Sequence, residues 1–161
     1  VWRSDRVCRG PIPLPVRTHP FQEGIHPMSL DTVLNKIQQT VPECLAVGYV
    51  DMTTGMLLGV RTLDSHPAEV LELVAAATAD LFQGSNVTAI ESMFKKSRGL
   101  ADDDHHYFQE IIVMSDNLLH IFLRGSKYDN QVLTIVCRKS ANLGMAVSKS
   151  RLAVKDVEAA V

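Results

Sequence analysis

The sequence predicts an α+β domain with the element order α-ββ-α-βββ-α, in which a five-stranded antiparallel sheet has helices packed on it. Three observations support this class. Apolar residues recur at helical spacing in several separate stretches. Short apolar runs of strand length are joined by turn-forming residues. The strands come as a group of two and a group of three, and a long helical stretch lies between the groups. One sheet covered by helices is the simplest arrangement that buries all of these apolar faces.

The first expected elements are a helix and a hairpin. Apolar residues from Leu30 to Ile37 fall at positions i, i+3, i+4 and i+7, and Ser29 is a capping residue type. Pro42 prevents the helix from continuing far. Two apolar runs and the turn residues between them then predict the hairpin: residues 44–50, 56–60 and 51–55.

A long helix is expected next, and it is apolar around more than half of its circumference. Asp64 and Ser65 are capping types before it, and Gly84 is a stop signal after it. A further helix is expected over residues 86–98. The broad apolar face of the long helix comprises Val70, Leu71, Val74, Ala77, Thr78, Leu81 and Phe82.

The last expected elements are three strands and a helix. The strands cover residues 107–114, 118–124 and 131–138, with turn residues between them. The final helix runs from about Ala141 to the end of the sequence. We expect Asn142 or Ser140 to cap this helix, and Gly144 to permit close approach to the sheet.

Composition limits the class of function. Of the 161 residues, 46% are hydrophobic and 21% are charged, which is ordinary for a globular protein and argues against disorder throughout. A net charge of −2 gives no reason to expect binding to nucleic acid or insertion into a membrane. The three cysteines, Cys8, Cys44 and Cys137, are too few and too widely spaced for a disulfide framework or a zinc site, so a reducing, cytoplasmic location is expected.

The composition changes sharply at Met28. Residues 1–27 contain five of the seven prolines, which cannot donate backbone hydrogen bonds to a helix or sheet. We expect these residues to be either a non-native leader or a genuine proline-rich arm, whose Pro-x-Pro-x-Pro stretch would dock on an aromatic groove. Residues 28–161 are expected to form the folded domain.

The expected element order resembles that of the Roadblock family, a relative of the profilin and longin folds, in its bacterial stand-alone form. Residues 45–51 and 54–58 resemble the opening hairpin of that family, and residues 118–124 and 132–137 resemble its closing strands. The Asn-Leu-Gly sequence at residues 142–144 resembles the start of the last helix of the family. The resemblance covers roughly residues 29–157, and the helix over residues 86–98 is an addition to a minimal Roadblock domain.

The resemblance implies a non-enzymatic, homodimeric scaffold that binds or regulates a small Ras-like GTPase. Two long helices would pack together, and the third strand of each copy would pair edge to edge. It implies no catalytic residue, cofactor or metal. The implied dimer and partner interface consists of Val70, Leu71, Val74, Thr78, Leu81, Phe82, Tyr107, Gln109 and Ile111.

The residues give their own reasons to expect dimerisation. A helix packed on one sheet buries one stripe, so a second apolar face on the long helix indicates an interface. A strand at the edge of a sheet also needs protection or pairing, and the strand from Tyr107 to Met114 follows a long excursion of the chain.

Two alternatives of other classes stay open. Related α/β scaffolds hold small molecules between sheet and helices, so a small-molecule-sensing module is the second hypothesis. The third is a metal-dependent enzyme that uses the loop from Asp102 to His106, because carboxylates and imidazoles ligate metals. The sequence has neither a phosphate-binding Gly-x-x-x-x-Gly-Lys motif nor a Gly-x-Ser-x-Gly motif, so we do not expect it to bind nucleotide itself or to be a serine hydrolase.

Overall fold

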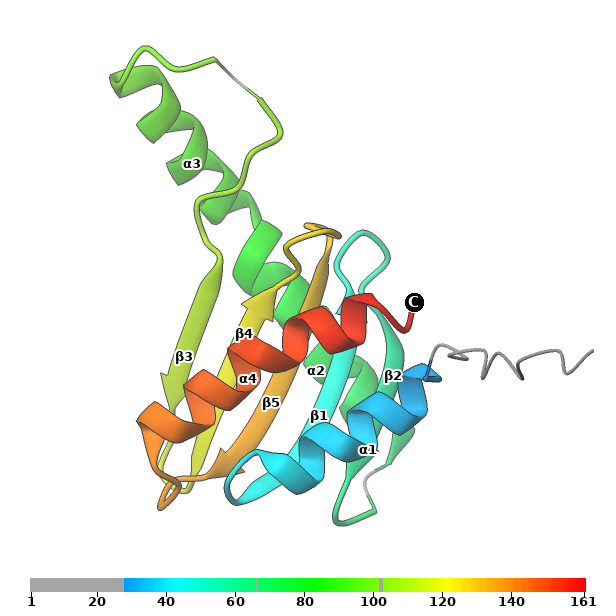
Figure 1. Cartoon of the computed structure of the whole chain (residues 1–161). Helices are drawn as coiled ribbons and strands as arrows, with labels where there is room; N and C mark the ends of the chain where they lie inside the picture. Colours follow the sequence, from blue (N-terminus) through cyan, green and yellow to red (C-terminus); the bar gives the residue numbers. More distant parts are fainter. Residues whose placement is uncertain (1–27, 66, 102) are drawn as a thin grey trace, which may run out of the picture.

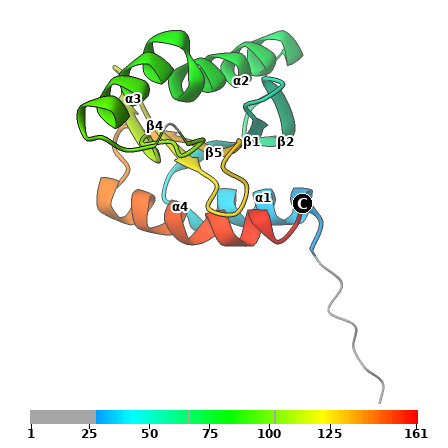
Figure 2. The same ribbon diagram turned by 90° about the horizontal axis from the view of Figure 1, so that it is seen from above.

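The computed structural model describes residues 28–65, 67–101 and 103–161 (Figure 1). A single antiparallel sheet forms the middle layer, with α1 and α4 on one face and α2 on the other (Figure 2). The predicted α+β class and element order are confirmed, including a separate helix after the long one. The elements are α1 (Leu30–Thr40), β1 (Cys44–Asp51), β2 (Met56–Thr62), α2 (Ala68–Gln83), α3 (Ser85–Ser97), β3 (Glu110–Met114), β4 (Leu118–Arg124), β5 (Gln131–Arg138) and α4 (Leu143–Glu158).

The strand order across the sheet is β2-β1-β5-β4-β3. The first and last strands of the sequence therefore pair at the centre, and β2 and β3 form the two edges. A register shift between Cys44 and Ala46 interrupts the pairing of β1 with β5, so one extra residue, Leu45, is inserted in β1. Successive side chains of a strand point to opposite faces of the sheet, so one extra residue moves the side chains that precede it to the other face.

The main core lies between the sheet and the pair α1 and α4. Ser29 caps α1 as expected, and its Oγ accepts a hydrogen bond from the Thr32 amide. Gly59 allows α1 to approach β2 closely, because a Cβ atom there would lie 2.9 Å from Cδ1 of Leu34. The buried residues of this layer include Val33, Leu34, Ile37, Val47, Tyr49, Leu119, Ile121, Leu133, Ile135, Ala146, Val154 and Val157.

The start of α4 differs in one detail from the expectation. Asn142 is the cap, and its Oδ1 accepts a hydrogen bond of 2.9 Å from the Met145 amide, so the helix begins at Leu143. Gly144 does not serve close approach to the sheet. It is exposed, and a Cβ atom there would meet only the Asn142 Oδ1 atom, at 3.5 Å. Ala146, two residues later, is the first residue of α4 that is buried in the core against the sheet.

A single residue, Gly84, separates α2 from α3. Its φ of −56° and ψ of 153° interrupt the helical path, so α3 projects beyond the end of the sheet (Figure 1). The backbone of Gly84 is not left-handed, so its φ angle does not demand glycine. The reason for a glycine here is space, because a Cβ atom would lie 2.5 Å from the Asp80 carbonyl oxygen. The helix expected over residues 86–98 is confirmed and begins at Ser85.

The strand expected over residues 107–114 is shorter in the structure, because β3 begins at Glu110. The amides of Tyr107 and Phe108 instead donate to the carboxylate of Glu91, so these two residues belong to the loop that follows α3. The expectations for residues 1–27 and Asp102 lie outside the described residues.

Within the described part of the chain, no helix has the length and apolar character needed to cross a membrane.

Candidate protein-interaction surface

One side of α2 packs on the chain's own sheet. Ala75, Thr78 and Phe82, at positions i, i+3 and i+7, are buried. Phe82 is fully covered and packs with Met52, Phe122 and Val132 in a second core cluster. The Thr78 hydroxyl donates to the Val74 carbonyl oxygen at 2.8 Å, which satisfies its buried polar group. The α2 helix therefore packs on its own sheet mainly through these three inward residues.

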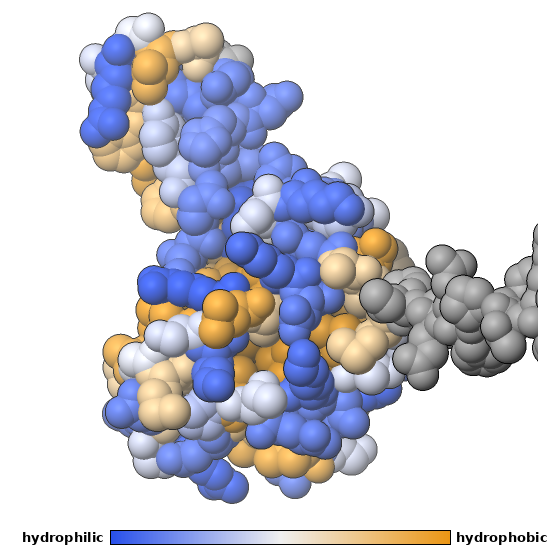
Figure 3. Space-filling model, in the orientation of Figure 1, coloured by the Kyte–Doolittle hydropathy of each residue, from blue (hydrophilic) through white to orange (hydrophobic). Residues whose placement is uncertain are grey.

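A second side of α2, next to the buried one, carries a stripe of apolar residues in contact with solvent, which we call the α2 stripe. Leu73 is 70% exposed, and Val70, Val74 and Leu81 are between 39% and 46% exposed. The spacing is that of one helix face. The α2 stripe consists of Val70, Leu73, Val74, Ala77 and Leu81. Figure 3 shows the other helical face, formed by α1 and α4, where hydrophilic residues cover much of the surface and apolar residues show through in patches.

The interface residues expected on the long helix divide into three groups. Val70, Val74 and Leu81 are in the α2 stripe, and Leu71 is half-buried between α2 and β2. Thr78 and Phe82 must be dropped from the expected surface, because helical spacing turns both toward the sheet of their own chain. Leu73 was missed at the sequence level, although its position three residues after Val70 is the signal that finds it.

The expected interface residues near β3 lie along one edge of the sheet. β3 pairs with β4 on one side and with no strand of the described chain on the other. Ile111 is half-buried against the Phe82 cluster, Gln109 is exposed, and Tyr107 is half-buried in the loop. Arg151 of α4 braces the strand, since its Nε and Nη2 atoms lie 2.9 and 3.0 Å from the carboxylate oxygens of Glu110. The outer edge of β3 thus presents backbone hydrogen-bonding groups on a supported strand.

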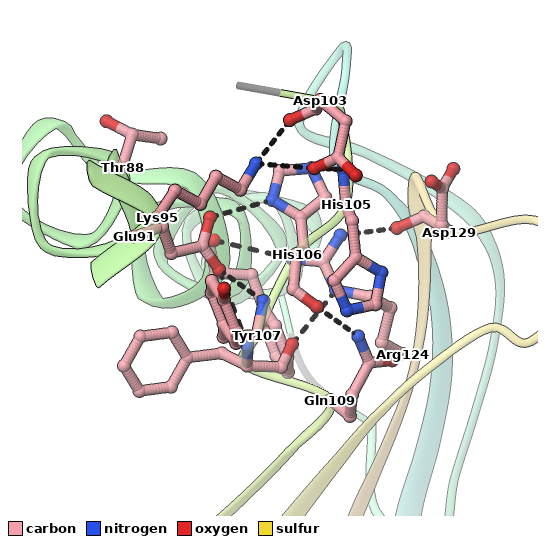
Figure 4. Close-up of polar contacts among 12 residues, drawn as sticks. Thr88, Glu91, Lys95, Asp103, His105, His106, Tyr107, Gln109, Arg124 and Asp129 are labelled. Atoms are coloured by element: carbon pink, nitrogen blue, oxygen red, sulfur yellow. Dashed lines mark hydrogen bonds and ion pairs between the residues drawn. The ribbon is translucent and has the colours of Figure 1, made fainter. Parts of the chain in front are cut away.

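The loop between α3 and β3 is fixed to α3 by one buried carboxylate (Figure 4). Oε1 of Glu91 accepts hydrogen bonds from the amides of Tyr107 at 2.7 Å and Phe108 at 3.4 Å. Oε2 lies 3.0 Å from Nδ1 of His106. Burial raises the pKa of Glu91, but the hydrogen bonds from His106 and the two amides outweigh burial and hold this pKa below its usual value.

A second contact lies one helical turn further along α3. The ammonium group of Lys95 is buried and pairs with the Asp103 carboxylate at 3.1 Å, and it also donates to the Asp103 carbonyl oxygen (Figure 4). Glu91 and Lys95 occupy the side of α3 that the loop covers. The apolar residues Ile90, Met93 and Phe94 are exposed. The loop therefore neutralises the charged side of α3 and leaves apolar side chains in solvent.

Arg124 joins three separate segments from within the fold. Its side chain is buried and donates to the carbonyl oxygens of Phe108 at 3.0 Å, Phe82 at 3.4 Å and Asp129. The guanidinium also lies over the Phe82 ring, 5.1 Å from its centroid. Burial lowers the pKa of Arg124, and the negative charges of Glu91 and Asp129 oppose this change. Arg124 thus holds the end of α2, the loop just before β3 and the β4–β5 loop in one arrangement.

The loop residues considered as metal ligands have other partners. Asp103 pairs with Lys95 and His106 with Glu91, while Asp104 and His105 are exposed. Asp102 lies outside the described residues. Across the part of the chain that the structure describes, no group of three His, Cys, Asp or Glu side chains is placed to hold a metal ion.

An open groove lies between the β2 edge and α2. Its volume is about 550 Å³, and it is lined by apolar side chains and one carboxylate, that of Glu72. A smaller apolar cavity of about 50 Å³ lies deeper, between the sheet and α2, and shares Leu57, Val60 and Leu71 with the groove. The buried hydroxyl of Thr134 lines this cavity and has no hydrogen-bond partner in the described chain.

These features define a class of protein, a three-layer α+β domain with strand order 2-1-5-4-3 and an exposed apolar helix over one face of the sheet. No family model and no curated protein matches the sequence. Solved structures do match, and they show that the chain has the Roadblock fold. The Roadblock/LC7 domain from Streptomyces avermitilis is 17% identical with a TM-score of 0.58, and the match covers 81% of this chain and 96% of that one.

Two further structures with this fold are MglB proteins. Myxococcus xanthus MglB is 16% identical with a TM-score of 0.59, over 80% of this chain and 90% of that chain. The gliding protein MglB from Thermus thermophilus is 18% identical with a TM-score of 0.58, over 80% of this chain and 86% of that chain. The predicted Roadblock fold is thereby confirmed at the level of the fold.

Proposed function

We propose that this protein is a non-enzymatic homodimeric scaffold whose α2 stripes pack against each other. The observation that carries the proposal is the exposure of the α2 stripe on a helix that already packs on its own sheet through Ala75, Thr78 and Phe82. Leu73 alone leaves 70% of its surface in water. An apolar face of this kind on a folded domain is typical of a protein interface.

The energetic argument favours a second copy of the same chain. Full burial of a leucine or valine side chain contributes about 1.5–3 kcal/mol, and a two-fold interface counts each stripe residue twice. The exposed fractions of the four large side chains of the stripe add up to about two full side chains on each copy, so the two stripes together contribute about 6–12 kcal/mol, which is comparable to the association cost of about 4–15 kcal/mol. A two-fold interface requires a surface that fits a second copy of itself. An apolar stripe along one helix meets this requirement when two copies of the helix cross.

The edge of β3 supports the same arrangement. Its outer backbone groups need a partner, and a second β3 strand in antiparallel orientation supplies one without any new element. Val113 and Ile112, each about 40% exposed, would be covered at such a junction. The proposed surface on each copy therefore combines the α2 stripe with the outer edge of β3, including Gln109 and Ile111.

We further propose that the dimer binds or regulates a small Ras-like GTPase. The support is the resemblance of the sequence to Roadblock domains together with the shared fold of the gliding protein MglB. The absence of a phosphate-binding motif from the sequence agrees with a partner of a GTPase and not a GTPase. We also propose a domain that spans residues 28–161, with residues 1–27 as an arm or leader outside it, and a cytoplasmic location.

Sedimentation equilibrium tests the dimer first, because one chain has a mass of 17.8 kDa. We expect twice this mass at micromolar concentration, and a single-chain mass at high micromolar concentration would contradict the proposal. Fluorescence anisotropy with small GTPases of the source organism, each loaded with GDP or a GTP analogue, tests the partner. The GTPase proposal fails if no such protein binds while the dimer persists.

The groove between β2 and α2 favours a second candidate function, the sensing of a small molecule. Its volume is within the range of ligand sites, and the Thr134 hydroxyl in the adjoining cavity lacks a partner in the described chain. An apolar ligand with one hydrogen-bonding group would fit this pattern. Native mass spectrometry of the purified protein tests it, because a bound molecule adds a discrete mass, and Leu71→Trp should abolish that adduct by filling the groove.

A further inference from the structure

Cys44 and Cys137 lie directly opposite each other on the two central strands. Cys44 begins β1, Cys137 lies near the end of β5, and the two are partners in the antiparallel pairing. Both thiols are free and buried. The two residues are remote in sequence, so this position arises only from the pairing of the first and last strands of the sheet.

The extra residue in β1 is what brings the two thiols to the same face. Val47 and Tyr49 point to the α1 and α4 face, so strict alternation would turn Cys44 to the α2 face. The register shift at Leu45 reverses the alternation, and Cys44 joins Cys137 in the core cluster under α1 and α4.

The backbone hydrogen bonds identify this as the closer of the two kinds of antiparallel pair. The Arg138 amide donates to the Glu43 carbonyl oxygen at 3.0 Å, so the bond is made by the neighbours of the cysteine pair, as in a non-hydrogen-bonded pair. Such pairs have a Cα separation of about 4.5 Å. This separation is within the range of about 4.4–6.8 Å that a disulfide spans.

The thiols also interact with each other. Their mutual hydrogen bond lowers the pKa of Cys137 and raises that of Cys44, while burial and the negative charge of Glu43 act against ionisation of Cys137. The thiol of Cys44 is also 3.4 Å from the Ala46 carbonyl oxygen, across the extra residue. The thiol of Cys44 therefore favours ionisation of Cys137, and the resulting thiolate opposes ionisation of Cys44.

We propose that Cys44 and Cys137 form a redox-active dithiol that closes to an intrachain disulfide when a peroxide reaches it. One thiolate attacks a peroxide oxygen, the O–O bond breaks, and the released hydroxide takes a proton to become water. The second thiolate then attacks the sulfur of the resulting sulfenic acid, the S–O bond breaks, and a second water leaves. Two electrons pass from the two thiols to the peroxide, so no further reactant is needed.

The disulfide would join the first and last strands on the sheet face away from the α2 stripe. It would leave the proposed dimer surface unchanged and would restrict unfolding of the central strands. The inference does not rest on the proposed function, since it would hold equally for a monomeric domain.

The test uses the full chain with the substitution Cys8→Ser, which removes the remaining thiol. The folded protein is treated with hydrogen peroxide, and free thiols are then alkylated in denaturant. We expect both thiols to be protected from alkylation and the intact mass to fall by about 2 Da, which dithiothreitol reverses. A peptide map should contain a Cys44–Cys137 linkage, and a non-reducing gel should show a single chain. The same chain carrying Cys44→Ala as well should form no disulfide.

A second measurement is the urea midpoint, which should rise on oxidation only when both cysteines are present. The proposal is overturned if both thiols can still be alkylated after the folded protein has been treated with peroxide, if each is oxidised separately to a sulfinic acid, or if the linkage forms only after denaturation. It is equally overturned if the peroxide product is a bond between two chains. Each of these overturning outcomes is read from the chain that keeps both Cys44 and Cys137, so failure of the Cys44→Ala variant to fold does not affect them.

Discussion

Glu91 of α3 accepts a hydrogen bond of 2.7 Å from the backbone amide of Tyr107, which lies in the loop just before β3. This contact ends the sheet pairing of β3 and lays the loop on the charged side of α3. The apolar residues Ile90, Met93 and Phe94 of α3 stay exposed. One carboxylate therefore helps to decide which surfaces of the molecule remain available to a partner.

The hold of Glu91 on the loop should depend on pH. Its folded pKa lies below the ordinary value of 4.5, so the stabilising contribution is present above that value and is lost as the pH falls through the folded pKa. We expect Tyr107 and Phe108 amides to be protected from hydrogen exchange near neutral pH. Glu91→Gln should speed their exchange by about tenfold, because a neutral acceptor forms weaker hydrogen bonds.

The matched control for this prediction is Glu69→Gln, which removes an exposed carboxylate from the first turn of α2. It should leave the exchange of Tyr107 and Phe108 unchanged. Equal exchange rates in Glu91→Gln and the unsubstituted protein at neutral pH would show that the carboxylate does not anchor the loop.

Replacement of Arg124 should destabilise the whole domain. Arg124→Lys keeps the positive charge but has no planar group that can reach the carbonyl oxygens of Phe82, Phe108 and Asp129 together. We expect a loss of about 2–4 kcal/mol in the free energy of unfolding, measured in urea, because a single ammonium group leaves some of these carbonyl oxygens without a hydrogen-bond donor. Arg138→Lys, at an exposed position, should change this free energy by less than about 0.5 kcal/mol.

Two glycines should respond in opposite directions to alanine. Gly84→Ala places a Cβ atom 2.5 Å from the Asp80 carbonyl oxygen, so the α2–α3 junction must shift, and we expect a loss of about 1–3 kcal/mol. Gly144→Ala meets only ordinary contact and improves helix propensity in α4, so a gain of about 0.5–1 kcal/mol is expected. Urea unfolding of both variants measures the difference, and equal effects would contradict it.

The order and type of the elements could be predicted because each carries a local signal. The spacing from Leu30 to Ile37, the cap at Asn142 and the turn between β1 and β2 act over a few residues, and the structure has all three. Boundaries decided by distant partners could not be predicted. Tyr107 reads as the start of a strand until its amide is seen to bond to Glu91.

The site was only partly predictable for the same reason. Helical periodicity identifies an apolar face on α2, but a face wider than half the circumference does not indicate which residues the sheet will take, so Thr78 and Phe82 were assigned to the wrong side. Glu91 and Lys95 have the spacing of solvated surface charges, and only the loop buries them. The juxtaposition of Cys44 and Cys137 depends on one extra residue in β1, which no local pattern announces.

The pair Leu73 and Leu152 tests the proposed dimer most directly. Their exposed fractions are 70% and 71%, but Leu73 lies in the α2 stripe and Leu152 lies on the outer face of α4. Each is replaced by aspartate, and the mass in solution is measured by size-exclusion chromatography with light scattering at several concentrations. Leu73→Asp should raise the dimer dissociation constant by at least about 100-fold, since two buried leucines are replaced by charges that face each other.

We predict that the unsubstituted protein and Leu152→Asp elute as dimers of twice 17.8 kDa, and that Leu73→Asp elutes as a folded monomer. A monomeric unsubstituted protein, or a dimer that Leu73→Asp leaves intact, would contradict the account.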